Sequence, residues 1–357
     1  MLYVLNLFLI IFYYFVIYNS SLKKKKKKLL FAWIISLHAI LFRALASPYD
    51  FVDTENYATA FLHIANLNLK QLFLDQDYIG WGYGYVMINW LISKISTDVH
   101  FFFVSISILS VGIVMYFYSR TSHSLILTAL LYFIYPMMYL MGFGVIRQHL
   151  SVAFVFLALY FIDDLKKSIP FAVLAILTHY AALIFIPYYF WRSLDTKKMY
   201  SLKVIILMVL GFVLLRMIMG STISTLDEVG ISRYNSFGEE NDHLNIMPFI
   251  IFASLVTMLL WARVFSKCQG RDSEILNFTI YGLLVSIFSL GLSGGGRLTI
   301  YVLYIVPVAA TLLLKYAHNI RDLSKVYVAL LTLLFFRQNM VMMSNFVISF
   351  DYKFFWE

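Results

Sequence analysis

Charged residues are scarce in this chain of 357 residues, because only 13% are Asp, Glu, Lys or Arg while 61% are hydrophobic. A soluble globular domain carries about 25% charged residues. So few charges cannot cover so much apolar surface in water, and the solvent must therefore be lipid. This composition excludes a cytosolic enzyme, a secreted binding module and a disordered regulator.

Cysteine is nearly absent, since Cys268 is the single one in the sequence. One cysteine excludes a disulfide framework and any cysteine-based zinc or iron–sulfur site. Six prolines and sixteen glycines argue against a low-complexity or fibrous chain. The internal repeat that marks many transporters is also missing.

Long hydrophobic runs make up much of the sequence. A run of about 18 residues or more can cross a bilayer as a helix. The first run has no basic leading region and no small-residue cleavage site, so we expect an uncleaved helix rather than a signal peptide. The sequence thus predicts a single all-α polytopic membrane domain over 1–357 with about ten spans. These spans are predicted at 1–19, 29–46, 99–119, 124–141, 147–163, 202–219, 247–265, 275–293, 298–316 and 325–345.

The net charge of +9 is a topology signal in such a chain before it indicates a partner. An uninterrupted lysine run at 23–28 is the strongest marker, and it is predicted to lie in the cytoplasm. Both termini then lie outside, together with the loops 47–79 and 220–246. Because neither loop is long enough for a separate domain, we expect the site to be built from helix ends and short loops.

Two hydrophobic segments are ambiguous, and the number of membrane crossings that the basic residues allow decides how each is interpreted. Arg120 belongs inside, so 80–97 and 99–119 cannot both cross the bilayer. We therefore predict that 80–97, which begins Gly-Trp-Gly-Tyr-Gly-Tyr, is an interfacial helix on the outer surface. By the same argument 168–191 is predicted to be a hairpin of two half-helices, with His179 at its outward tip.

Three basic residues stand out, because a charge within the membrane costs at least about 2.5–3.5 kcal/mol. Arg147 opens a predicted helix, where a cation is disfavoured, so it needs an anionic neighbour or ligand. His179 lies at the predicted tip, although a lone histidine in an apolar run is often only a satisfied core residue. Arg43 lies near the outer end of its helix, where it either snorkels to the headgroups or contributes to function.

Asp53 precedes a predicted helix over 54–66, where its side chain is expected to cap the helix, to catalyse, or to do both. Arg297 follows a glycine run, and backbone N–H groups at such a helix start can bind phosphate. The acidic run 239–243 is most simply a solvated loop. Its side chains leave a divalent metal open, but no ligand spacing requires one. We therefore expect no cofactor.

The common factor is an excess of outward arginines over carboxylates. The planar guanidinium group binds phosphate and pyrophosphate through two parallel hydrogen bonds. One acid, one histidine and several arginines in the membrane thus predict a lipid-linked pyrophosphate substrate rather than nucleic acid. The arginines are Arg43, Arg147, Arg233 and Arg297.

Three stretches of the sequence match a known family in order and spacing. They are Arg43 followed by Asp53-Thr-Glu-Asn-Tyr57, the helix start Ile146-Arg147-Gln148-His149, and the segment Thr178-His179-Tyr180. With these motifs the chain resembles the EpsG-type polysaccharide polymerases, one branch of the bacterial Wzy-type polymerases of O-antigen and capsule. The resemblance covers most of the chain, and the C-terminal half matches by hydropathy and by Arg297.

The resemblance implies a GT-C-like helical bundle with an interfacial "jaw" helix after the first outward loop. It also implies a multi-pass protein of the bacterial inner membrane whose active site faces the exterior. Such polymerases transfer a growing glycan from undecaprenyl pyrophosphate to the sugar end of a lipid-linked repeat unit. Lipid-linked oligosaccharides and membrane lipids are the implied partners, and a chain-length regulator is a further candidate.

The expected site combines the residue arguments with the motifs. Arg147 and Arg297 are expected to hold the pyrophosphates, and Asp53 or His179 to accept the proton from the attacking hydroxyl. A single displacement predicts inversion at the anomeric carbon, because retention would need a carboxylate nucleophile. The remaining substrate-binding candidates are Arg43, Glu55, Tyr57, Gln148, Tyr180 and Arg233.

Other classes of membrane protein remain open at this stage. A polysaccharide flippase or transporter would also be polytopic and basic inside, but is expected to show repeat symmetry and charge along a central path. A membrane O-acyltransferase would place its histidine toward a cytoplasmic acyl donor. The ligases that pass finished glycans to a lipid core typically carry a longer outward loop than 220–246.

Overall fold

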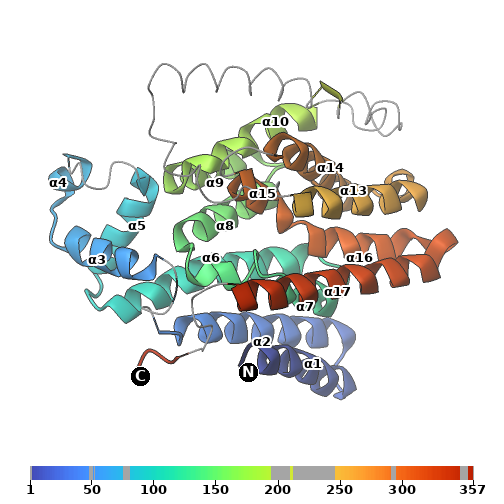
Figure 1. The fold of residues 1–357 in the computed structure, drawn as a ribbon, viewed down its shortest axis with the longest axis horizontal. Helices are drawn as coiled ribbons and strands as arrows, with labels where there is room; N and C mark the ends of the chain where they lie inside the picture. The colour runs from blue at the N-terminus through green and yellow to red at the C-terminus, as the bar shows by residue number, and fades with distance from the viewer. Residues whose placement is uncertain are drawn as a thin grey trace. The chain divides into compact units, whose positions relative to one another are not determined.

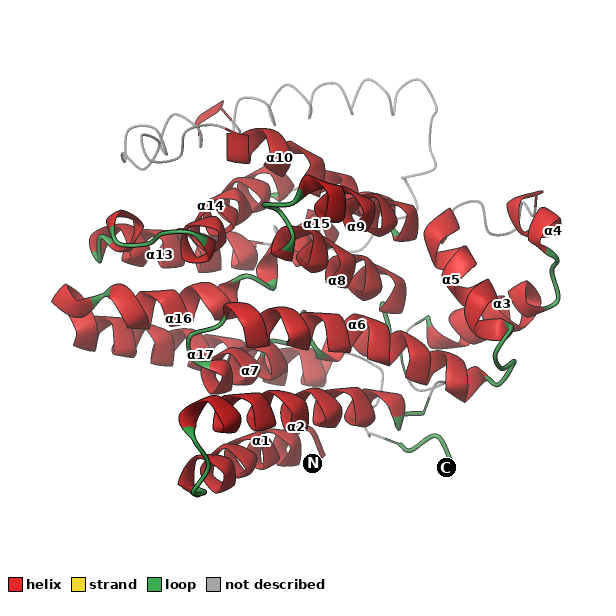
Figure 2. Ribbon diagram, turned by 180° about the vertical axis from the view of Figure 1, so that it is seen from behind, coloured by secondary structure: helices red, strands yellow, loops and turns green. Residues whose placement is uncertain are grey.

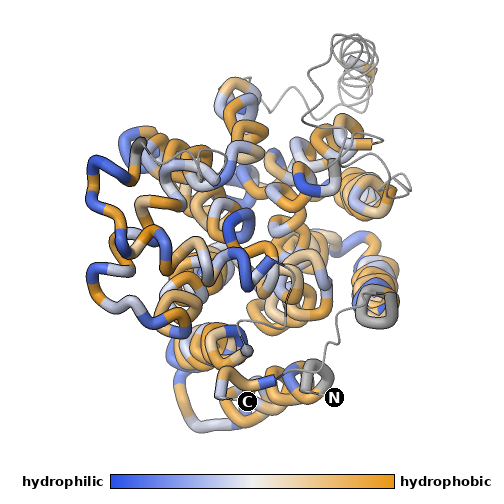
Figure 3. The backbone as a smooth tube through the Cα atoms, turned by 60° about the vertical axis from the view of Figure 1, so that its left-hand side comes forward, coloured by the Kyte–Doolittle hydropathy of each residue, from blue (hydrophilic) through white to orange (hydrophobic). Residues whose placement is uncertain are grey.

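The computed structural model describes residues 2–47, 51, 53–74, 81–193, 210–211, 246–290, 295–345 and 353–356. Within these residues the fold is helical, as Figures 1 and 2 show, which confirms the predicted all-α class. The one strand-like feature among them is an isolated antiparallel bridge between Ala46 and Phe354. Hydrophobic residues predominate along the helices (Figure 3). The predicted span 202–219 and the loop 220–246 lie almost entirely outside the described residues.

The chain divides into two compact units. Unit 1 comprises Met1–Leu183 and Ala329–Glu357, and unit 2 comprises Ile184–Val328. The expectation of one domain over 1–357 stays a prediction, and the same holds for the GT-C-like arrangement. The helices of unit 1, in chain order, are α1 (Leu2–Asn19), α2 (Lys24–Ala44), α3 (Thr54–Ala65), α4 (Leu69–Leu74), α5 (Tyr83–Ser93), α6 (Val99–Thr121), α7 (Leu125–Ile134), the 3-10 turn η2 (Leu140–Phe143), α8 (Ile146–Tyr160) and α9 (Leu165–Thr178).

Unit 2 holds the remaining elements, with two that cross its boundaries. The 3-10 helix η3 (Tyr180–Phe185) begins in unit 1, and α17 (Arg321–Asn345) ends there. The elements between them are α10 (Ile186–Ser193), α13 (Ile246–Trp261), η5 (Val264–Ser266), α14 (Arg271–Ser289), α15 (Gly295–Leu303), α16 (Val306–Tyr316) and η6 (His318–Ile320).

Helix α6 is the centre of unit 1. It packs against α2 on one side and α8 on another, and α8 in turn packs against α9. Among the described helices, α6 is the one that is both long and apolar enough to cross a membrane alone. The pair α15 and α16 passes the same test together but bends by 44° between its two parts.

Several predicted spans are shorter or more broken in the structure than the hydrophobic runs suggest. Helix α7 ends at Ile134, two residues before Pro136, because the residue before a proline avoids the α conformation. The run 298–316 is interrupted between α15 and α16, where Pro307 lies in the first turn of α16 and lacks a backbone donor. The number of helices that cross the membrane therefore stays a prediction.

The two ambiguous segments contain the local structure expected of them. Helix α5 occupies the middle of 80–97 and has 11 residues, which is too short to span a bilayer. Helix α9 ends at Thr178, so the break falls at His179. The interfacial position of α5 and the hairpin over 168–191 stay predictions.

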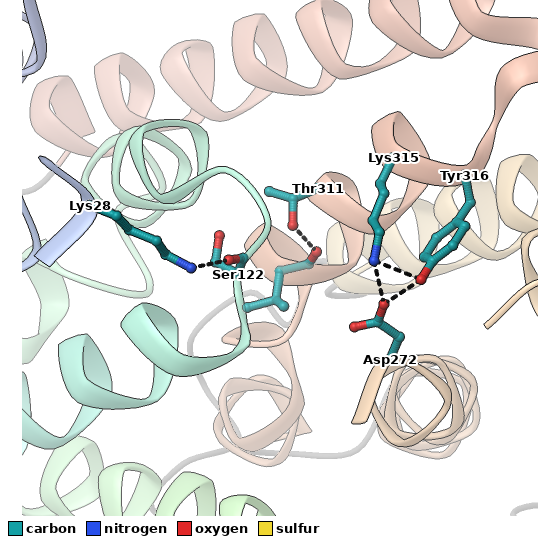
Figure 4. Close-up of polar contacts among 7 residues, drawn as sticks. Lys28, Ser122, Asp272, Thr311, Lys315 and Tyr316 are labelled. Carbon is teal, nitrogen blue, oxygen red and sulfur yellow. Dashed lines mark hydrogen bonds and ion pairs between the residues drawn. The ribbon is translucent and has the colours of Figure 1, made fainter. Parts of the chain in front are cut away.

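Polar contacts at the helix ends agree with the positive-inside assignment within unit 1. Lys28, near the start of α2, donates to the carbonyl oxygen of Ser122 at the end of α6, at 3.1 Å (Figure 4). The lysine run and Arg120 thus lie at one end of the α2–α6 pair. Arg43, in the last turn of α2, lies toward the opposite end, before the loop that is predicted to face outward.

Candidate active site

Helix α5 is the element around which the candidate residues gather. It packs against α3, α6 and α9, and its N-terminal turn carries tyrosines and glycines. The end of α2 and the start of α8 approach the same region through α6 and the turn η2. All of these elements belong to unit 1.

Arg43 is buried inside unit 1, with 7% of its surface exposed. Its Nη1 atom donates a hydrogen bond of 2.9 Å to Oγ of Ser110 on α6. Its guanidinium carbon lies 6.0 Å from the centre of the Phe143 ring. The side chain therefore turns into the helix bundle, and the alternative that it snorkels to the headgroups does not describe it.

Gly142 separates Arg43 from a second basic residue. A Cβ atom at this glycine would lie 3.3 Å from Nη1 of Arg43 and 3.2 Å from Nδ1 of His149. His149 is itself buried, with 3% exposed. The turn η2 thus holds the Arg43 guanidinium and the His149 imidazole close together, and only a residue without a side chain leaves both undisturbed.

Arg147 is the second residue of α8 and is half-buried. Its guanidinium carbon lies 5.4 Å from the centre of the Trp81 ring, just before α5. A cation–π contact of this kind orients a guanidinium group without neutralising it. Arg147 is therefore positioned at a helix N-terminus, where a nearby anion is favoured by the helix dipole.

The register of α8 and α9 places His179 across from Arg147. The two helices run antiparallel, and the Ser151 hydroxyl donates to the Ala175 carbonyl oxygen at 2.7 Å. One helical turn from this contact, toward the start of α8 and the end of α9, lie Arg147 and His179. His179 is half-buried and occupies the C-cap position of α9.

The start of α5 is pressed against the end of α9. A Cβ atom at Gly82 would lie 2.5 Å from the carbonyl oxygen of Leu177, and one at Gly84 would lie 2.9 Å from the Leu177 Cβ atom. Gly82 also has φ +86°, a conformation that other residues adopt only with strain. These glycines hold Trp81 and the first turn of α5 beside the end of α9, next to His179.

An aromatic cluster joins α3 to α5. The ring centres of Tyr57 and Trp81 lie 5.3 Å apart, and those of Tyr57 and Tyr85 lie 5.9 Å apart. Burial raises the pKa of the Tyr85 hydroxyl well above its ordinary value, with a further rise from Tyr57, while the charges of Arg147 and Arg43 lower it. Two guanidinium groups from separate helices therefore act on one phenol. We call Arg43, Tyr57, Trp81, Tyr85 and Arg147 the Tyr85 cluster.

Asp53 stands at the predicted helix start but does not cap it. Helix α3 begins at Thr54, as expected, yet the Asp53 side chain accepts no capping hydrogen bond. The reason is its backbone, which has φ 64° and ψ −4° instead of the extended conformation that directs a cap side chain at the helix. Asp53 is exposed, and Tyr57 lies one helical turn further along the chain in α3.

The other predicted residues divide by exposure and by unit. Gln148 is 1% exposed, whereas Glu55 and Tyr180 are exposed. Arg297 is exposed in the first turn of α15 in unit 2, so the structure gives it no position relative to the Tyr85 cluster. Arg233 lies outside the described residues.

Sequence reasoning left some residues of this region unassigned. Ser110 and His149 contact or neighbour Arg43, and Tyr85 lies at the centre of the cluster. Tyr85 could have been found from its sequence context, because it follows Trp81 and Tyr83 in a short aromatic run. Ser110 had no signal beyond being a small polar residue in an apolar run. Among the described residues, no three His, Cys, Asp or Glu side chains are grouped to hold a metal ion.

Comparison with known proteins gives one family. Residues 37–354 match the EpsG family, so the match extends from α2, before Arg43, to the C-terminal segment. No curated protein and no solved structure matches the chain.

Proposed function

Because the chain belongs to the EpsG family, which is a Wzy-like polymerase family, we propose that it polymerises a polysaccharide from lipid-linked repeat units. The growing glycan leaves its polyprenyl pyrophosphate carrier and joins the sugar end of one lipid-linked repeat. The reaction takes place at the Tyr85 cluster, on the outer side of the bacterial inner membrane. The product is an O-antigen, a capsule or an exopolysaccharide.

The observation that carries this proposal is the convergence of two arginines on Tyr85. Arg43 comes from the end of α2 and Arg147 from the start of α8, and the charges of both act on one buried phenol of α5. Two positive charges that both act on one buried phenol of a membrane protein favour an anionic ligand beside that phenol. A diphosphate offers the oxygen geometry that two guanidinium groups bind best.

The arginines would act mainly on the leaving group. As the bond from the anomeric carbon to the pyrophosphate oxygen lengthens, negative charge grows on the pyrophosphate and the sugar gains oxocarbenium character. Positive groups that are already in position stabilise this charge more in the transition state than in the ground state. Ser110 and the rings of Phe143 and Trp81 supply that positioning. Arg297 and Arg233 are proposed as further pyrophosphate ligands on sequence grounds.

The acceptor hydroxyl must lose a proton as it attacks. Asp53 is a candidate because its carboxylate is exposed and takes no part in capping α3. His179 is a candidate because the α8–α9 register brings it across from Arg147. Either residue would act as general base in a single displacement, which inverts the anomeric carbon. The Trp81 ring, which is half-buried, offers a flat apolar face for a sugar.

Replacement of Arg147 tests the proposal. Cells that lack the protein and carry Arg147→Ala are expected to show the lipid core capped with a single repeat and no long chains, at unchanged protein level. Arg120→Ala is a matched control, because Arg120 also lies 5.4 Å from an aromatic ring, that of Tyr116, at the opposite end of α6. The control is expected to retain the full ladder of chain lengths.

Other results would overturn the assignment. A normal ladder with Arg147→Ala would remove Arg147 from the site, and loss of even the single capped repeat would indicate a flippase instead of a polymerase. Loss of glycan in Arg120→Ala as well would mean that any arginine is needed for folding.

A further inference from the structure

Tyr85 carries a polar group that the fold itself does not use. The residue is 1% exposed and lies in the first turn of α5. Its hydroxyl group interacts with the Asn89 side chain, which lowers the pKa of the phenol, but it forms no hydrogen bond of normal length and angle with any described residue. The same holds for the amide oxygen of Asn89, one turn further along α5, although the Asn89 amide nitrogen donates to the Tyr85 carbonyl oxygen at 2.9 Å.

An unsatisfied buried hydroxyl lowers stability, because it loses its hydrogen bonds with water on folding and gains none in return. Native proteins keep few such groups. Phenylalanine would fill nearly the same volume at this position without that penalty. A tyrosine that retains the penalty is therefore best explained by a ligand that arrives later.

The surroundings of the hydroxyl define the chemistry of that ligand. The charges of Arg43 and Arg147 both reach the phenol, and the rings of Tyr57 and Trp81 pack around it. A positive field makes a negatively charged oxygen the favoured acceptor. Burial raises the pKa of Tyr85 well above its ordinary value, so the phenol keeps its proton at neutral pH and can only donate to such an oxygen.

The backbone around Tyr85 holds the hydroxyl in place. Gly82 and Gly84 press the first turn of α5 against Leu177 and Thr178, which leaves no room for that turn to shift toward α9. A donor fixed before the substrate binds costs no reorganisation when charge develops. This is the arrangement expected of a group that acts on a transition state.

We propose that Tyr85 is a further catalytic residue, which donates its hydroxyl hydrogen bond to a phosphate oxygen of the departing lipid diphosphate, between Arg43 and Arg147. This inference rests on the proposed function. No covalent bond to Tyr85 forms or breaks, and the phenol keeps its proton throughout. Tyr85 thereby shares the negative charge that the leaving group gains.

The test compares Tyr85→Phe with Tyr118→Phe in the purified full-length protein. Tyr118 is a matched control, because it is 0% exposed on α6, two helical turns beyond Ser110, and its ring packs against Tyr132. Two quantities are measured: turnover of lipid-linked repeat units and the midpoint of thermal unfolding in detergent.

We expect Tyr85→Phe to lower turnover by about 10- to 100-fold, the effect of losing one hydrogen bond to a charged transition state. Its unfolding midpoint should stay unchanged or rise by about 1–3 °C, because an unsatisfied hydroxyl has been removed. Tyr118→Phe should retain turnover within about twofold and gain no stability, because the buried Tyr118 hydroxyl, unlike that of Tyr85, does not lack a hydrogen-bond partner.

Either of two results would overturn the role of Tyr85. Unchanged turnover in Tyr85→Phe would mean that the hydroxyl does not contact the reacting groups. A lower unfolding midpoint would mean that a permanent partner, such as a bound water molecule, satisfies the hydroxyl in the resting protein. Measuring Arg147→Ala in the same assay distinguishes failure of the role proposed for Tyr85 from failure of the proposed polymerase function. An inactive Arg147→Ala with a fully active Tyr85→Phe removes only Tyr85, whereas full activity in Arg147→Ala removes the proposed function.

Discussion

Charged groups are held in different ways at the Tyr85 cluster and at the cytoplasmic ends predicted for unit 2. Lys315 lies 3.0 Å from a carboxylate oxygen of Asp272, and the Tyr316 hydroxyl donates to the same oxygen at 2.7 Å (Figure 4). At the Tyr85 cluster, a hydroxyl and an aromatic ring are among the contacts of the cations, because Arg43 donates to the Ser110 hydroxyl and Arg147 lies over the Trp81 ring.

The two arrangements are suited to different roles. A carboxylate neutralises the cation that it holds, so an ion pair near the surface contributes a modest amount to stability and leaves little field. A hydroxyl or an aromatic ring orients a guanidinium group while its charge persists. The second arrangement is suited to binding an anionic substrate, and the first to fixing helix ends.

The largest expected effect comes from exchanging carboxylates in the two regions. Asp53→Asn should reduce turnover by about 10²- to 10⁴-fold if Asp53 is the base, with the unfolding midpoint unchanged, because asparagine tolerates the left-handed backbone at this position. Asp272→Asn should leave turnover unchanged and lower the free energy of unfolding by about 0.5–1 kcal/mol, through loss of the ion pair with Lys315. Glycan synthesis from purified repeat units and thermal unfolding measure the two effects.

His179, the second candidate base, is tested in the same assay. If Asp53→Asn retains turnover, His179→Gln should show the large loss instead, and the base is then His179. If both variants retain turnover, the outer end of unit 1 does not supply the base. A large loss of turnover in Asp272→Asn would contradict the division between a structural and a chemical carboxylate.

A smaller effect is expected from two glycines with left-handed backbones. Gly82→Ala adds a Cβ atom 2.5 Å from the Leu177 carbonyl oxygen at φ +86°, so α5 must move away from α9. We expect a loss of about 2–4 kcal/mol in stability and at least a tenfold loss of turnover, because Tyr85 and Trp81 move with α5. Gly270→Ala in unit 2 has φ +55° and no atom within 4 Å of the new Cβ, so about 1–2 kcal/mol of strain is the whole cost.

Turnover per folded molecule shows whether Gly82→Ala disturbs the site more than Gly270→Ala does. Equal losses of turnover in the two variants would mean that the contact between α5 and α9 has no special role. Thermal unfolding of each variant, measured beside its turnover, separates the strain from the displacement of the site.

The sequence predicted the local features of this site better than its contacts. Arg147 at a helix start and a break at His179 both follow from residue types over a few positions, and the structure confirms those local features. The contact of Arg43 with Ser110 joins residues 67 positions apart, and it depends on the packing of α2 against α6, which no local pattern records. Asp53 shows the opposite error, since its residue type suits a cap but its positive φ angle prevents the side chain from forming one.

Helix breaks show why hydropathy alone overestimates continuity. The runs 124–141 and 298–316 are predominantly apolar, so a hydrophobic window treats each as one span. Pro136 and Pro307 were visible in both runs, and each lies at the observed interruption. A backbone donor lost to proline changes helix geometry without changing hydropathy, which is why the two criteria must be applied together.

Modification of Cys268 is expected to affect activity least. Its slow reaction with thiol reagents allows introduced cysteines in the two regions to be compared. Burial, with a further contribution from Asp272, raises the pKa of this thiol from its ordinary value of about 9 to about 12. The thiolate fraction at neutral pH is then lower by about a thousandfold, so Cys268 should react slowly with maleimides in the native protein and quickly in denaturant. Because the native thiol reacts slowly, single cysteines can be introduced beside it and labelled selectively. The Lys315→Cys variant should keep full turnover, and the Arg147→Cys variant should lose it.

Introduced cysteines are then labelled in intact cells with a reagent that cannot cross the membrane. This labelling tests on which side of the membrane each position lies. Cysteines at Asp53, Arg147 and His179 should be labelled from outside, because the register of α8 with α9 brings the last two together at the end where Arg43 lies. A cysteine at Lys315 should be labelled only after the cells are opened. Labelling of position 147 from the cytoplasm and position 53 from outside would separate the arginine from the acid by the bilayer, and no single diphosphate could then contact both.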